Sequence, residues 1–309
     1  MSFARIAIIG VGLIGSSIAR AVGASGMNAE VRLYDASPDV RARAQTLNIG
    51  LVCATAEEAV CDADLVILAT PVGAMAAATA GLVDALADGA VLTDVGSTKR
   101  AVVDALAKIT PARAYFIAGH PIAGTEQSGP DAGFASLFEN RWTILTPQDD
   151  ARPRYQEALS RLSAFWTALG ARVEIMDADR HDLVLAITSH VPHLIAFNIV
   201  ATAEDLETVT ESEIVKYSAG GFRDFTRLAA SDPVMWRDVF LANKDAVLEI
   251  LGRFTEDLAA LQRAIRWGDG DALHGIFERA RRVRREVIEA GQDTPAPNWG
   301  RDQGGDGKS

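Results

Sequence analysis

Short apolar runs rich in branched residues alternate with helical stretches through the first half of the chain. Runs of this composition are typical of strands buried on both faces of a sheet, and they occupy residues 5–9, 31–34, 65–69 and 91–94. Helical spacing is found between them, at residues 13–24, 38–47, 73–86 and 99–109. Three more strands at 115–118, 142–146 and 172–175, with a helix at 153–169, would complete this part near residue 176. Repeated strand–helix units predict an α/β fold with a doubly wound parallel sheet.

The strand signals stop after Asp177, and the following residues favour helices at 179–202, 211–217, 224–230, 233–263 and 269–290. The stretch 183–199 is apolar nearly all round, which indicates burial against a partner subunit as well as against its own chain. Apolar residues almost disappear after Gly291. We therefore expect an α/β domain over residues 1–176, an all-helical dimerisation domain over 177–290 and a disordered tail over 291–309.

Two apolar stretches could be mistaken for membrane or targeting segments. Residues 183–203 contain two histidines, a proline and an asparagine, whose transfer into a bilayer is costly, so a buried helix of a soluble protein is favoured. Residues 1–26 begin like a signal peptide, but three glycines interrupt the apolar run. We expect neither a membrane partner nor secretion.

Charge and cysteine usage narrow the class of partner further. The chain of 309 residues carries 30 Lys and Arg against 41 Asp and Glu, a formal net charge of −11, so nucleic acid is not an expected partner because its phosphates would meet a field of the same sign. Cys53 and Cys61 lack the spacing of metal ligands, and we expect both to be reduced core residues. This usage fits a cytoplasmic protein.

A glycine motif follows the first expected strand and opens the first expected helix. Its sequence is Gly10-Val11-Gly12-Leu13-Ile14-Gly15. In this setting the first glycine makes a tight turn, the second lets the backbone approach a pyrophosphate, and the third lets helix and strand pack closely. The helix N-terminus also attracts an anion. The motif predicts a Rossmann-type site in which Gly10, Gly12, Leu13, Ile14 and Gly15 bind a dinucleotide.

The second expected strand ends at Asp35, whose carboxylate would accept hydrogen bonds from the adenosine ribose. No arginine follows immediately to bind a 2′-phosphate, so NAD is favoured over NADP, and the N-terminal position of the motif favours a nicotinamide over FAD. Thr70 and Pro71 leave the next strand of the sheet at its carboxyl end, where the cofactor crevice is expected. An ordinary strand-to-helix turn explains these two residues equally well.

Polar side chains concentrate in four short segments. Two of them, D-V-G-S-T-K at 94–99 and G-H-P-I-A-G-T-E at 119–126, are expected to leave neighbouring strands at the same carboxyl-end crevice. The other two, S-H-V-P-H at 189–193 and G-G-F-R-D-F-T-R at 220–227, lie in the helical part.

These four segments, in this order after the glycine motif, resemble the prephenate/arogenate (cyclohexadienyl) dehydrogenase family over residues 5–290. The resemblance implies an NAD-dependent oxidoreductase of tyrosine biosynthesis that works as a homodimer. Such an enzyme oxidatively decarboxylates prephenate to 4-hydroxyphenylpyruvate, arogenate to tyrosine, or both. The ring and its carboxylate are common to the two substrates, so the choice between them stays open.

The chemistry asks for a group that takes the proton of the ring hydroxyl while hydride leaves the same carbon, and a neutral imidazole suits this task. The resemblance assigns it to His120, for which capping of a turn is the structural alternative. Ser97 matches the family serine that hydrogen-bonds the histidine and the nicotinamide, and it could also cap the helix that follows.

Substrate contacts follow from the same resemblance. Arg227 would hold a substrate carboxylate, with a surface ion pair to Asp224 as the alternative. His193 would face the substrate while His190 stays buried and hydrogen-bonded. Glu126 would line the pocket unless it is solvated, and Gly220 would admit the substrate's side-chain end unless it only begins a helix.

A metal site is not expected. His190 and His193 share a helix face, but His181 lies nine residues before His190 and would project from the opposite face, so a third ligand is missing. The basic run at 279–285 is interleaved with glutamates and indicates a solvated, salt-bridged face or a subunit contact.

Two other functions fit parts of the pattern. A β-hydroxyacid or imine-reducing dehydrogenase would also join a Rossmann domain to helices, and Lys244 beside Asn243 could supply the lysine such a site needs. A non-catalytic dinucleotide sensor would bind NAD without turnover.

Overall fold

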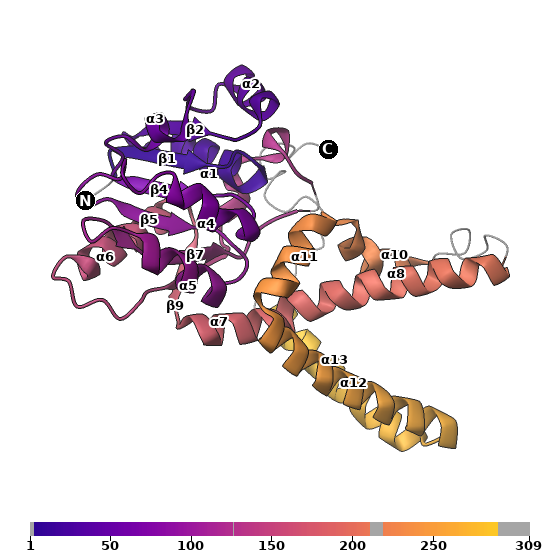
Figure 1. Cartoon of the computed structure of the whole chain (residues 1–309). Coiled ribbons are helices and arrows are strands. Elements are labelled where there is room, and N and C mark those ends of the chain that lie inside the picture. The colour runs from indigo at the N-terminus through magenta and orange to yellow at the C-terminus, as the bar shows by residue number, and fades with distance from the viewer. Residues whose placement is uncertain (1–2, 126, 211–218, 290–309) are drawn as a thin grey trace, which may run out of the picture.

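The computed structural model describes residues 3–125, 127–210 and 219–289. Its first half contains a six-stranded parallel sheet in the order β3-β2-β1-β4-β5-β6 (Figure 1). The strands are β1 Arg5–Ile9, β2 Glu30–Tyr34, β3 Leu51–Val52, β4 Leu65–Leu68, β5 Val91–Asp94 and β6 Tyr115–Phe116. The order reverses beside β1, which confirms the expected doubly wound α/β fold.

Helices cover both faces of this sheet. They are α1 Leu13–Ala24, α2 Pro38–Leu47, α3 Ala56–Val60, α4 Val72–Ala80, α5 Arg100–Ile109 and α6 Tyr155–Ala168. Ile6 and Ile8 of β1 enter the core shared with α1 and α6, whereas the alternating residues Ala7 and Ile9 enter the core shared with α3, α4 and α5. This explains why the strand reads as a continuous apolar run.

Several details of the first half differ from expectation, and strand β3 and helix α3 were not expected at all. The helix expected over 73–86 ends at Ala80, and turns follow from Gly81. Cys53 is buried, but Cys61 is exposed because it ends α3 at the surface, so the expectation of two core cysteines was wrong for Cys61. The strand expected over 115–118 is divided, since Ile117 separates β6 from a new strand.

That new strand belongs to a second sheet of three strands, β7 Ala118–Pro121, β8 Trp142–Thr146 and β9 Arg172–Ile175. β7 pairs antiparallel with β8, and β8 pairs parallel with β9. The long connection after β7 contains two 3₁₀ turns, Pro130–Ala132 and Ala135–Phe138, and returns the chain in the opposite direction. The chain therefore leaves the parallel sheet before it reaches the G-H-P-I segment.

The described part of the second half is helical, as expected. It comprises α7 Ala178–Leu185, a π-helical segment Ala186–His190, α8 Val191–Thr210, α10 Gly220–Thr226, a 3₁₀ turn Arg227–Ala230, α11 Pro233–Ala242, α12 Lys244–Trp267 and α13 Gly270–Glu289. The helix expected over 233–263 is two helices, because the chain breaks at Asn243. The helix expected at 211–217 and the tail at 291–309 lie outside the described residues.

Proline explains the π-helical segment. Pro192 has no N–H to donate to the carbonyl four residues earlier, and the preceding turn widens so that the Val191 N–H bonds the Ala186 carbonyl instead. One extra residue in a helical turn rotates everything that follows by about 100°. The segment therefore changes which side chains of α7 and α8 share a face.

The continuous helical run Ala178–Asp205 is long and apolar enough to cross a bilayer by length and composition, with a mean hydropathy of 1.7 over its most apolar window. Only 28% of that window is buried within the chain. Figure 1 shows α8 and the α12–α13 pair leaving the α/β body as two arms. Large apolar side chains are exposed along both arms, among them Ile199, Leu258 and Phe277. One subunit therefore leaves a large apolar surface uncovered.

Candidate functional site

The glycine loop has the geometry that a dinucleotide needs. Gly10 has a φ of +100°, and a Cβ there would lie 2.5 Å from the Ala69 carbonyl oxygen. A Cβ on Gly15 would overlap the Gly10 carbonyl, whereas one on Gly12 would meet nothing within 4 Å. Gly12 precedes α1, which begins at Leu13 and Ile14 and has no side-chain cap. The first N–H groups of α1 are therefore directed at an open surface where an anion could bind.

Asp35 lies beside this loop. Its Oδ2 accepts a hydrogen bond from the Val11 N–H at 2.8 Å, and its Oδ1 accepts one from the Ser37 N–H at 2.9 Å. Sequence reasoning missed Arg41, which reaches back from the first turns of α2 and donates from Nη1 to the Asp35 carbonyl at 2.6 Å. The sequence signal that could have found Arg41 was its position four residues after Ser37, the N-cap of α2.

Thr70 and Pro71 connect β4 to α4 next to the glycine loop. Pro71 is the N-cap residue of α4, and no side chain caps that helix. The Thr70 hydroxyl is buried without a hydrogen-bond partner among the described residues. The loop thus places a hydroxyl without a hydrogen-bond partner among the described residues at the same edge of the sheet as the glycine loop.

A buried ion pair joins the end of β5 to β7. Lys99 Nζ bonds Asp94 Oδ2 and donates to the Gly119 carbonyl at 2.7 Å. Asp94 also accepts from the N–H groups of Gly96 and Gly119, at 2.8 and 3.2 Å. Both charged side chains are wholly buried. Burial lowers the pKa of Lys99, and the Asp94 carboxylate counteracts that effect.

His120 follows Gly119 and is a member of strand β7, where it is opposite Ile144, and not of the loop that the sequence indicated. The ring is buried, and its Nδ1 lies 2.9 Å from Nε2 of His181 on α7. Burial holds the pKa of His120 well below its usual 6.5, and nearby His181, Lys99 and His190 lower it further. The imidazole is therefore neutral at pH 7.

Ser97 is half-buried in the loop between β5 and α5. It does not cap α5, because that helix begins at Arg100 and its N-cap position is Lys99. Asp182 of α7 supplies the cap instead, accepting from the N–H groups of Lys99 and Arg100 at 2.7 and 2.9 Å. The alternative role of Ser97 as a cap of α5 is therefore wrong, because the capping residue comes from the helical half.

His181 and Asp182 are the main site residues that sequence reasoning missed. His181 Nδ1 lies 2.8 Å from Asp182 Oδ1, and both side chains are buried. His181 and His190 both lower the pKa of His120, so both side chains lie near its ring, although their spacing predicted that they project from opposite faces. The π-helical segment between them rotates the helix after it relative to α7. The sequence signal that could have found them was a histidine directly followed by an aspartate in the first turns of a helix. A solvent-exposed helix face does not require such a pair.

Asn243 explains the break between α11 and α12. Its side-chain amide donates to the Asp182 carbonyl at 2.8 Å and to His190 Nδ1 at 3.0 Å. His190 is buried, as expected, and burial lowers its pKa to about 4. The Asn243 amide thus ties the π-helical segment to the start of α7.

His193 is half-buried and stacks on Trp236 of α11 with ring centroids 3.7 Å apart. Its Nδ1 donates to the Ser189 carbonyl at 2.8 Å, which leaves Nε2 as an acceptor. Burial lowers the pKa of His193, and the charge of Arg227 lowers it further, so the two side chains are neighbours. Asp224 is paired with Arg223 at 3.1 Å.

Two expected substrate-binding residues remain, Gly220 and Glu126. Gly220 is the first residue of α10, consistent with a helix start. Glu126 lies outside the described residues. Among the described residues, no three His, Cys, Asp or Glu side chains form a group that could hold a metal ion.

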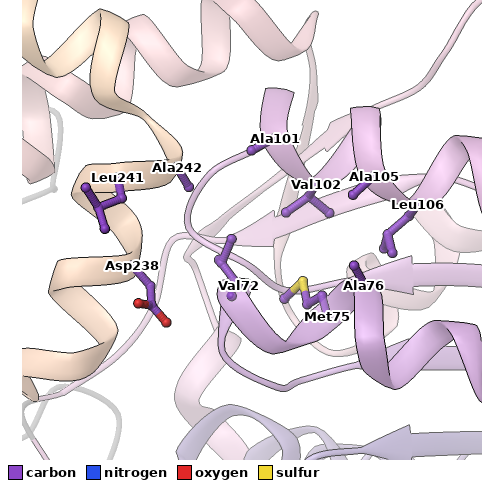
Figure 2. A pocket seen from close by; sticks show the side chains of 11 residues that line it. Val72, Met75, Ala76, Ala101, Val102, Ala105, Leu106, Asp238, Leu241 and Ala242 are labelled. Carbon is purple, nitrogen blue, oxygen red and sulfur yellow. The ribbon is translucent and has the colours of Figure 1, made fainter.

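A separate apolar pocket lies where the two halves meet. Figure 2 shows Val72 and Met75 of α4 and Val102 of α5 on one side, with Asp238 and Leu241 of α11 on the other. None of the expected site residues lines it. We assign the chemistry to the polar cluster around His120, because the pocket is lined almost wholly by apolar side chains and its one carboxylate, Asp238, is paired with Arg237.

Two family domains together match most of the chain. The family domain described as "Prephenate dehydrogenase, nucleotide-binding domain" matches residues 18–175, and "Prephenate dehydrogenase, dimerization domain" matches residues 177–279.

Curated relatives match over most of their own length. Cyclohexadienyl dehydrogenase of Zymomonas mobilis is 44% identical over 283 residues, which are 91% of this chain and 95% of that protein. Prephenate dehydrogenase of Bacillus subtilis is 33% identical over 287 residues, 90% of this chain and 75% of that protein. The crystal structure of prephenate dehydrogenase from A. aeolicus with hydroxyphenyl propionate and NAD+ is 34% identical, has a TM-score of 0.86 and covers 93% of this chain and 99% of that one.

Proposed function

Because this chain belongs to the prephenate dehydrogenase family, we propose that it oxidatively decarboxylates prephenate, arogenate or both, with NAD as the oxidant. The observation that carries the proposal is His120, a buried neutral imidazole at the junction of the two halves, next to the carboxyl end of β5. Neither a β-hydroxyacid dehydrogenase nor a dinucleotide sensor has a comparable observation in its favour.

The dinucleotide fits the residues present. Gly10, Gly12, Leu13, Ile14 and Gly15 provide the open helix N-terminus for its pyrophosphate, Asp35 would accept from the adenosine ribose, and Thr70 and Pro71 would border the nicotinamide half. When bound, NAD would supply the oxidant for the hydride that leaves the ring carbon carrying the hydroxyl.

The protein has one proton to handle. His120 would take the proton of the ring hydroxyl, on the ring nitrogen that does not contact His181. Ser97 would hydrogen-bond His120 and the nicotinamide from the loop before α5. Loss of the ring carboxylate as CO2 then makes the ring aromatic, which supplies much of the driving force.

Substrate recognition would come from the helical half. Arg227 would bind a carboxylate of the substrate, and His193 would accept a hydrogen bond at Nε2. Gly220 and Glu126 would contact the substrate's side-chain end.

We propose domains at 1–176 and 177–290 with a tail at 291–309. The helical domain, whose arms expose apolar side chains, would form a homodimer, and the protein would be cytoplasmic.

The direct test follows NADH absorbance with prephenate and with arogenate, each in the presence of NAD or NADP. We expect NADH from at least one substrate, with NAD preferred. No turnover of either substrate, with dinucleotide bound, would favour the sensor and overturn the proposal.

Asp35→Asn is expected to weaken NAD binding and to improve the NADP-to-NAD ratio of kcat/KM roughly 10-fold or more. The carboxylate repels a 2′-phosphate, and Arg41 is within reach to bind that phosphate once the repulsion is removed. Asp39→Asn, which neutralises an exposed carboxylate on α2, is the matched control. An unchanged ratio in Asp35→Asn would remove Asp35 from the discrimination of the two cofactors.

Arg227→Ala is expected to raise the KM for prephenate roughly 10–100-fold with a smaller change in kcat, because it removes a charged hydrogen bond made in the ground state as well as in the transition state. Initial-rate kinetics at saturating NAD measure both constants. The control is Arg223→Ala, four residues earlier, where an exposed arginine pairs with Asp224. A KM that changes equally in both variants would contradict the assignment to Arg227.

A further inference from the structure

A continuous chain of hydrogen bonds links His120 of the α/β half to His181 and Asp182 of the helical half. We propose that His181 and Asp182 are positioning residues for the reaction: they fix the tautomer of His120 and stabilise the proton that it takes from the substrate. The inference rests on the proposed function, since it assigns a purpose to the same imidazole. Neither residue belongs to the motifs that carried the family resemblance.

The hydrogen bonds permit one arrangement of protons. Both oxygens of Asp182 accept backbone N–H groups, from Lys99 and Arg100, so the ionised carboxylate is the form that satisfies them. His181 must then donate from Nδ1 to Asp182, and its Nε2 is left as an acceptor. His120 must in turn donate from Nδ1 to His181, which leaves the lone pair of His120 on Nε2.

That tautomer is the one the reaction needs. As the electron pair of the C–H bond leaves as hydride for the nicotinamide, the O–H bond of the substrate breaks and an N–H bond forms at His120 Nε2. His120 then carries a positive charge and donates to His181 through a charge-assisted hydrogen bond. Transfer of that Nδ1 proton to His181 Nε2 would move the charge one ring closer to the Asp182 carboxylate.

Other charged groups around His120 do not replace this carboxylate. Asp94, at the end of β5, is already paired with Lys99. Lys99 itself lowers the pKa of His120, and so does His190 of the π-helical segment. Burial also lowers the pKa of His181, so both rings of the chain start neutral. Among these groups, Asp182 is the anion that is connected to His120 through hydrogen bonds.

A purely structural role is the alternative, because Asp182 also caps α5 and so joins the two halves. Two substitutions separate the roles. Asp182→Asn places an amide N–H opposite His181 Nδ1 and would reverse the donor direction along the chain, giving His120 the wrong tautomer. His181→Gln can keep an acceptor near His120 Nδ1 but cannot carry a positive charge. Asp179→Asn breaks the exposed Arg100–Asp179 ion pair between the same two helices and is the matched control.

The experiment measures kcat, KM and their pH dependence for the wild type and the three variants, at saturating NAD. We expect kcat to fall about 100-fold in Asp182→Asn and about 10-fold in His181→Gln, with the KM for NAD changed less than about 3-fold. The acid limb of kcat/KM should move to lower pH in Asp182→Asn, because an imidazolium without its anion loses its proton more easily. Asp179→Asn should match the wild type.

Loss of rate with no shift of the acid limb, or an equal loss in Asp179→Asn, would reduce the pair to a structural role and overturn the inference. Inactive wild-type protein would instead overturn the proposed function. Imidazole ¹⁵N NMR of the full-length wild type gives an answer that does not depend on activity or on how the variants fold. It should show His120 protonated on Nδ1, and a proton on Nε2 would overturn the inference.

Discussion

Replacing His120 with asparagine is expected to lower kcat about 10²–10⁴-fold while NAD still binds. The asparagine amide can keep a hydrogen bond toward His181, but it cannot take a proton from the substrate hydroxyl. The glycine loop and Asp35 follow strands of the six-stranded sheet, whereas His120 is on β7 of the second sheet, so the dinucleotide site should stay intact. Stopped-flow or steady-state NADH formation gives kcat, and calorimetric titration with NAD gives the affinity.

The control for this variant is His274→Asn, which removes an exposed histidine on α13 and should leave both measurements unchanged. In the wild type, the acid limb of kcat/KM should lie below pH 6.5, because activity is lost only as pH falls through the depressed pKa of His120 and the ring becomes protonated. Near-full activity in His120→Asn would refute the role of His120 as the base.

Replacing Lys99 with methionine is expected to lower the free energy of unfolding by about 3–5 kcal/mol. The substitution leaves the Asp94 carboxylate in a fully buried site without its cation, and it leaves the Gly119 carbonyl without a donor. Because Gly119 precedes His120 in β7, this strand should loosen as well, so kcat should fall with stability. Urea unfolding followed by circular dichroism measures the change.

Two further variants separate the charge effect from a packing effect. Asp94→Asn combined with Lys99→Met removes the uncompensated charge and should recover part of the lost stability. Arg43→Met breaks the exposed ion pair between Arg43 and Asp131 and should cost no more than about 1 kcal/mol. If Lys99→Met cost as little as Arg43→Met, the buried pair would not hold β5 and β7 together.

Local sequence patterns predicted most of the first half correctly. Residues 13–24 and 38–47 form helices with the expected bounds, and the glycine loop takes the backbone geometry that its sequence indicates. Such features depend on neighbours a few residues apart, which is the range over which periodicity and turn preferences act.

Patterns of the same kind failed where contacts between distant segments decide the structure. Residues 233–263 have an uninterrupted helical pattern, yet the chain breaks at Asn243, whose amide is held by Asp182 and His190. His120 was expected in a loop, but pairing with β8 places it in a strand. Pro192 was visible in the sequence, but the rotation that its π-helical segment imposes on His190 was not anticipated.

By itself, the sequence determined the α/β and helical halves, the glycine loop after β1, and the family to which the polar segments point. Only the tertiary structure decided how the imidazole of His120 is held. His181 lies 61 residues from His120, and Asp182 lies 83 residues from the Lys99 N–H that it caps. A side-chain hydrogen bond between such distant positions depends on how the two halves pack, and no local pattern of hydrophobic and polar residues encodes that packing.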